Sequence, residues 1–97
     1  MADDYLKKAK SMRLATRQDV INGIKSYLVA GKILEDEKAD AISMDCLGMV
    51  EAKLVPTPPC GAWTILQDEG ITCGCEADLF GATSMMLTSD LLDGPGY

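Results

Sequence analysis

The chain has 97 residues, of which 47% are apolar and 25% are charged, and its formal net charge is −6. This balance predicts one small globular domain, spanning residues 1–97, with a modest hydrophobic core. An acidic chain whose few Lys and Arg residues are flanked by acids is a poor partner for nucleic acid. No apolar run approaches the ~20 residues that a membrane span needs.

Histidine is absent from the sequence, and there are four cysteines. Without His, the chain alone has no Ser–His or Cys–His nucleophile pair and no His-containing metal site. The amino terminus lacks the basic-then-apolar pattern of a signal peptide, so we expect a cytoplasmic protein. In that compartment the cysteines are expected to be thiols, not disulfides.

Two helices are predicted at the start of the chain. Residues 2–12 carry apolar residues at helical spacing, although the sequence defines the helix within residues 1–15 only weakly. Thr16 and Asp19 have the spacing of a capping box, and the apolar face that follows them predicts a helix over 17–36.

A first strand is predicted over residues 41–47, a compact apolar run that ends at Gly48. Residues 48–56 suit a loop with a short turn. The prolines at 56–59 then open a new element, a helix over 60–67 that Thr57 can cap.

A second strand is predicted over residues 71–75, after the glycine turn at Gly70. Asp78 is placed to cap the final helix, and Gly94 followed by Pro95 is a helix stop signal.

The predicted order is therefore α-α-β-α-β-α, an α/β fold with a short parallel sheet. A β-α-β crossover is expected to be right-handed, with helices covering the sheet in a Rossmann-like, three-layer-type arrangement. Two strands leave both edges of a sheet open. We therefore expect the edges to be completed by missing sequence or by a second copy, which makes a homo-oligomer the expected partner.

Three acids follow the predicted strands: Asp45, Glu76 and Asp78. Ligands in open α/β folds bind beyond the carboxyl ends of the strands, and carboxylate clusters suit hard cations such as Mg²⁺ or Mn²⁺. The alternative interpretation is that the acids do not converge: Asp78 only caps a helix, Glu76 is solvated and Asp45 accepts backbone hydrogen bonds. Spacing alone favours this second interpretation.

The cysteines give a weaker indication of a site. Cys73 and Cys75 form a Cys-x-Cys pair on one strand, while Cys46 and Cys60 lie elsewhere. Alternate residues of a strand share a face, so chelation is conceivable, but zinc sites usually offer two close cysteine pairs. Small buried thiols are the preferred interpretation. Trp63, the only tryptophan, is expected in the core or an interface.

Three segments follow one another along the chain: DCLG over 45–48, TPPCGAW over 57–63 and LQDEGITCGCEADLFGATSMML over 66–87. In this order they resemble the central region of the L-fucose/L-arabinose isomerase-like family. There a strand ending in an acid-Cys-like turn precedes a Pro-Cys helix, and "DEGI" followed by "CEAD" leads into the next helix. The similarity covers most of the chain from about Gln18 onward.

That family isomerises aldoses and ketoses with a divalent metal, usually Mn²⁺, held by a Glu, an Asp and a His. The resemblance implies that Asp78 matches the metal-binding Asp, with Glu76 beside it in the same rim. The family's Glu would fall within 62–64, where this chain has no acid, and its His would lie further along a longer chain.

The resemblance thus implies a middle piece of a longer isomerase-like protein, since continuation into a further strand is expected beyond Tyr97. Such a piece has no catalytic residue of its own, a remnant metal rim and little or no catalysis. Sugar would be a substrate only for the complete parent.

Two other functions are compatible with the sequence. One is a small stand-alone α/β interaction module that self-associates through its sheet edge without catalysis, as the helix stop at Gly94 suggests. The other is a thiol-dependent redox domain using Cys73 and Cys75, although no nearby group obviously lowers a thiol pKa.

Overall fold

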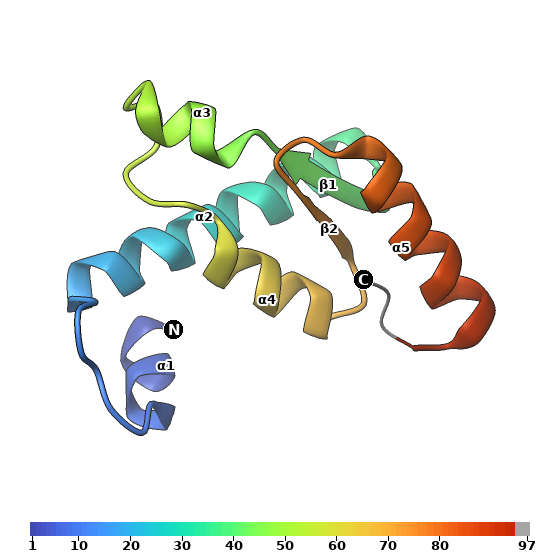
Figure 1. Ribbon diagram of the computed structural model, residues 1–97. Helices are drawn as coiled ribbons and strands as arrows, with labels where there is room; N and C mark the ends of the chain where they lie inside the picture. Colours follow the sequence, from blue (N-terminus) through green and yellow to red (C-terminus); the bar gives the residue numbers. More distant parts are fainter. Residues whose placement is uncertain (95–97) are drawn as a thin grey trace.

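The computed structural model describes residues 1–94 and shows a mixed helix–strand fold around a two-stranded parallel sheet (Figure 1). This confirms the α/β prediction. In chain order the elements are α1 (Ala2–Lys8), α2 (Arg17–Glu37), β1 (Ala41–Met44), α3 (Cys46–Glu51), α4 (Cys60–Asp68), β2 (Thr72–Cys75) and α5 (Leu79–Leu92).

The capping box that was predicted for α2 is present. The backbone N–H of Asp19 donates to Thr16 Oγ1 at 3.3 Å, and the Thr16 N–H donates to Asp19 Oδ2 at 2.7 Å. Both bonds satisfy N–H groups that a helix start leaves without partners. The helix ends one residue later than predicted, at Glu37, and Lys38 closes it with a left-handed φ of 50°.

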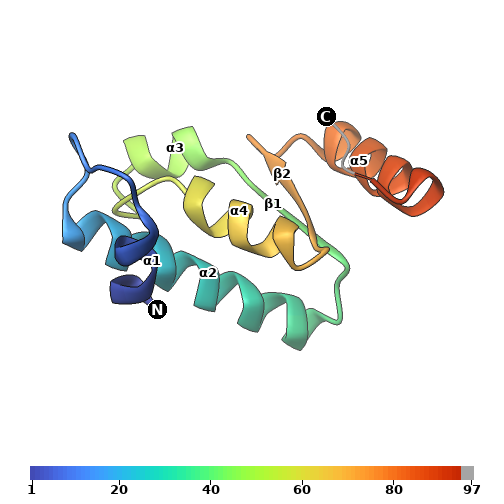
Figure 2. The same ribbon diagram turned by 90° about the horizontal axis from the view of Figure 1, so that it is seen from below.

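The two strands run parallel in a fixed register, from Ala41 opposite Thr72 to Met44 opposite Cys75. Helices α2 and α4 cover one face of this sheet and α5 covers the other (Figure 2). The core lies on the α2/α4 side, and its buried members are Ala30, Leu34, Ala62, Trp63, Leu66 and Cys73. Trp63 is thus a core residue, which is one of the two locations expected for it.

Gly74 allows α5 to approach the second face closely. A Cβ built on Gly74 would lie 2.9 Å from Ala82 Cβ and 2.9 Å from Ser43 Oγ, closer than a Cβ approaches any non-bonded heavy atom. Any larger residue would therefore push α5 away from the strands.

Three predictions were wrong in the segment between the strands. The first strand ends at Met44, not at residue 47, and residues 46–51 form helix α3 in place of a loop. The cause is Asp45, whose Oδ1 accepts the Gly48 N–H at 3.1 Å and so starts a helix inside an apolar run. Thr57 does not cap α4, which begins after Pro59 without a side-chain cap.

The ends of the described chain differ slightly from the prediction. Helix α1 stops at Lys8, short of residue 12, and Arg17 ties it to α2 through Asp3 at 2.9 Å. Helix α5 ends at Leu92, followed by Asp93 with a left-handed φ of 51°; Pro95, the other part of the predicted stop, lies outside the described residues. No helix in residues 1–94 has the length and apolar character needed to cross a membrane.

Candidate metal centre

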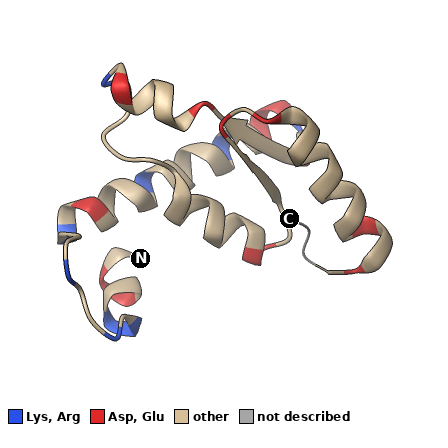
Figure 3. Cartoon of the chain, in the orientation of Figure 1, with Lys and Arg blue, Asp and Glu red and all other residues tan. Residues whose placement is uncertain are grey.

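The candidate site lies where both strands end. Met44 and Cys75 are paired in the sheet, so the chain leaves β1 and β2 at the same edge. The loops that follow carry several acids, which Figure 3 shows in red beyond this edge. Open α/β sheets bind their ligands at this position.

The loop after β2 has an unusual backbone that places Glu76. Glu76 and Ala77 both adopt left-handed conformations, with φ values of 53° and 55°, and each costs roughly 1–2 kcal/mol for a residue other than glycine. The Ala77 N–H donates to Met44 O at 3.0 Å, and the Asp78 N–H donates to Cys75 O at 3.0 Å. The first bond fastens the loop to the end of β1 and the second closes the turn after β2, so that the Glu76 carboxylate lies beside the start of α3.

Glu76 contacts residues from both loops. The Cys46 thiol donates to Glu76 Oε1 at 2.8 Å, and the Leu47 N–H reaches Oε2 at 3.5 Å. The Cys75 thiol lies 3.9 Å from the same Oε1. The hydrogen bond to Glu76, together with burial, raises the pKa of the Cys46 thiol above its ordinary value.

Cys46, Cys75 and Glu76 therefore form a group of potential metal ligands. One ligand atom from each residue lies within 4.8 Å of the other two. Cys46 is buried, whereas Cys75 and Glu76 are exposed, so the group opens to solvent on one side. Three such ligands can hold a metal ion and leave a fourth coordination position open.

The other two predicted acids serve as helix caps. Asp45 Oδ1 caps α3, as described above, and Asp78 Oδ1 accepts the Gly81 N–H at 2.8 Å to cap α5. At both caps the third residue after the acid is Gly, and a Cβ there would crowd the capping carboxylate. The three acids thus do not form one cluster: Glu76 joins the thiols, and the role of Asp78 as a metal ligand stays a prediction.

Sequence reasoning missed the pairing of Cys46 with Cys75. It considered Cys73 with Cys75, but Cys73 is buried in the core, and burial raises the pKa of its thiol to about 11. All four cysteines are free thiols, as expected. The useful clue was positional: one cysteine follows the first strand closely, the other ends the second strand, and parallel strands end together.

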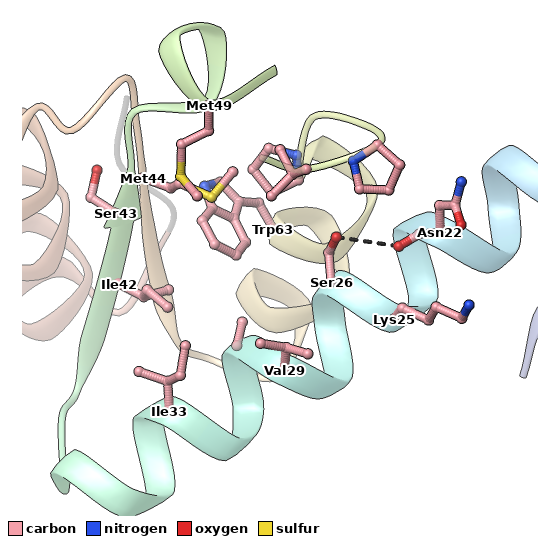
Figure 4. Close-up of a pocket in the computed structure, with 14 residues that line it drawn as sticks. Asn22, Lys25, Ser26, Val29, Ile33, Ile42, Ser43, Met44, Met49 and Trp63 are labelled. Carbon is pink, nitrogen blue, oxygen red and sulfur yellow. Dashed lines mark hydrogen bonds between the residues drawn. The ribbon is translucent and has the colours of Figure 1, made fainter. Parts of the chain in front are cut away.

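A separate hollow lies on the α2 side of the sheet, with a volume of about 540 Å³ (Figure 4). It is largely apolar, with Met44, Met49 and Trp63 at one end and Ile33 and Val29 along α2. The Ser43 side chain points away from this hollow, toward the α5 face.

No model of a protein family, no curated protein and no solved structure matches this chain.

Proposed function

We propose that this chain is part of an aldose–ketose isomerase-like protein and supplies the rim of its divalent-metal site through Glu76 and Asp78. The observation that carries the proposal is the position of both acids in the loop after β2, at the carboxyl edge of a parallel sheet. Further strands from the parent would complete a Rossmann-like, three-layer sheet at its open edges.

The loop gives the two acids distinct tasks. The left-handed backbone at Glu76 directs its carboxylate to the sheet edge, where it is exposed and available to a cation. Asp78 uses Oδ1 for its cap and keeps Oδ2 for a second contact. Carboxylate oxygens are the ligands that Mn²⁺ prefers. When bound, the metal supplies Lewis-acid polarisation of adjacent sugar oxygens as hydrogen moves between carbons.

The isolated chain should not turn over sugar. Residues 62–64 carry no acid and the sequence has no His, so two ligands of the set that the resemblance implies are missing. Metal-dependent isomerisation by the isolated chain would contradict this proposal.

The test is a Mn²⁺ titration followed by electron paramagnetic resonance, comparing the wild type with Asp78→Asn. Asn caps helices as well as Asp does, so the substitution removes the charge while α5 keeps its start. Asp45→Asn is the matched control, because it makes the same change at the cap of α3. We expect Asp78→Asn to weaken Mn²⁺ binding roughly tenfold or more and Asp45→Asn to leave it nearly unchanged. Equal binding by all three proteins, or none by the wild type, would overturn the proposal.

A second candidate is a self-associating module without catalysis. It is favoured by the sheet itself, which has two strands and thus two unpaired edges within residues 1–94. Unpaired strand edges are templates for pairing with another chain. Molar mass in solution separates the two candidates in part, because a strict monomer would count against edge pairing.

A further inference from the structure

We infer that Cys46, Cys75 and Glu76 form a binding site for a thiophilic divalent cation, with Zn²⁺ as the best-suited ion. Two thiolates and one carboxylate oxygen would hold it. This site goes beyond the proposed isomerase rim, since it depends on the thiols and not on Asp78, although Glu76 is common to both.

The three ligands are already near the required geometry. At Zn–S and Zn–O bond lengths of about 2.3 Å and 2.1 Å, a tetrahedral ion separates its ligand atoms by roughly 3.5–3.8 Å. Glu76 Oε1 lies 2.8 Å from Cys46 Sγ and 3.9 Å from Cys75 Sγ, and all three ligand atoms fit within 4.8 Å. Shifts of about 1 Å or less would admit the ion, well within the range of side-chain rotation.

The backbone fixes each ligand independently of any ion. Cys75 is the last residue of β2, paired with Met44, and Cys46 begins α3 two residues beyond that pair. The left-handed turn at Glu76 is fastened to Met44 O through Ala77. Strained backbone that the surroundings hold in place is typical of functional sites, and here it brings a carboxylate between two thiols.

The ligand chemistry selects the ion. Thiolates are soft ligands that favour Zn²⁺ over Mn²⁺ and Mg²⁺, and Zn²⁺ also stands well above Mn²⁺ in general affinity. Binding displaces one proton from each thiol to solvent, including the proton that Cys46 now donates to Glu76. Two thiolates and a carboxylate against Zn²⁺ leave the site with a net charge of −1.

The coordination would be incomplete, which suggests a reactive site and not a purely structural one. Structural zinc sites are closed by four protein ligands, whereas catalytic sites have three and an open position for water or substrate. The exposed side formed by Cys75 and Glu76 gives small molecules access to that position.

The experiment uses Co²⁺ as a spectroscopic substitute for Zn²⁺ on the reduced, metal-free chain. Cobalt bound by thiolates gives an intense sulfur-to-metal charge-transfer absorption, and Zn²⁺ should displace it at one ion per chain. Cys75→Ser is the decisive variant because Cys75 is exposed and its loss should not disturb folding. Cys60→Ser is the matched control, an exposed thiol outside the group.

We expect Cys75→Ser to lower Zn²⁺ affinity at least tenfold and to reduce the charge-transfer band, while Cys60→Ser preserves both. Cys46→Ser should act like Cys75→Ser, with circular dichroism confirming that it folds. A wild type without the band, or a band indifferent to Cys75→Ser, would overturn the inference. The Mn²⁺ experiment with Asp78→Asn is independent of this band, so either proposal can fail while the other stands.

Discussion

Some residues in this chain adopt backbone conformations that cost free energy and thereby position a functional side chain. Glu76 and Ala77 have left-handed φ values although neither is glycine. This strained turn places the Glu76 carboxylate in contact with Cys46. Gly74 is the opposite case, a residue whose missing side chain lets α5 pack on the sheet. Both effects are local, and both decide what lies at the carboxyl edge.

The buried Cys73 thiol should make the free energy of unfolding depend on pH. Burial raises its pKa from 9.0 to about 11, so the folded state holds the thiol proton more tightly than the unfolded state does. The stabilisation is complete below about pH 9 and is lost as pH rises toward 11. We expect the loss to amount to about 1–2 kcal/mol, at about 1.4 kcal/mol per pKa unit with partial screening by solvent.

Urea unfolding of the wild type and Cys73→Ala across this pH range measures the effect. All other ionisable groups are common to both proteins, so their contributions cancel in the difference. The free-energy difference between the two proteins should be constant below pH 9 and should change above it, with the wild type losing its advantage. A difference that stays constant up to pH 11 would contradict the buried-thiol explanation.

At the scale of elements, the sequence predicted most of the architecture. Helices α2 and α4, strand β2 and the cap of α5 were all expected: capping residues marked α2 and α5, and apolar runs bounded by proline or glycine marked α4 and β2. The prediction failed over residues 45–51: it placed 45–47 in the strand and 48–51 in a loop, whereas Asp45 caps a helix there.

The candidate site was less predictable than the fold. Glu76 was identified from its place after a strand, but its thiol partners depended on two facts that periodicity does not contain. One is the register that pairs Met44 with Cys75, and the other is the left-handed turn at Glu76. Neither a Gly nor an Asn marks that turn in the sequence.

Trp63 joins α4 to β2 through a side-chain hydrogen bond, and this contact between elements can be tested. Its Nε1–H donates to Gly74 O at 2.8 Å in a buried position. Trp63→Phe would remove this donor from the Gly74 carbonyl and create a small void. We expect a loss of about 1–3 kcal/mol in the free energy of unfolding.

The measurement is urea unfolding followed by far-ultraviolet circular dichroism, because the substitution removes the only tryptophan fluorophore. Thr64→Ala is the control: this neighbour is exposed and bonds only within its own helix, to Cys60 O. It should change stability by less than about 0.5 kcal/mol. If both variants lost the same free energy, the Trp63–Gly74 contact would not be the link between α4 and β2.

At the scale of the whole molecule, the chain leaves an unusual amount of apolar surface uncovered. Its radius of gyration is 14.0 Å, above the value of about 13 Å expected for 100 residues. Leu66 is the one large side chain within residues 1–94 that is completely buried, whereas Phe80 on α5 is 91% exposed. A core this small, with both sheet edges open, favours association with further protein.

From the open sheet edges and the uncovered apolar surface, we predict that the isolated chain self-associates through a sheet edge. Sedimentation over a series of concentrations should show the weight-average mass rising above that of the monomer. Hydrogen exchange at low and high concentration then locates the contact: amides of β1 or β2 should exchange more slowly as the concentration rises, because edge pairing gives them partners. The solvent-facing amides at the start of α2 serve as the internal control and should not change.

A mass that stays monomeric throughout would contradict edge pairing. Protection confined to α5, with the strands unaffected, would instead assign the contact to the exposed apolar helix and leave the sheet edges for strands of a longer parent.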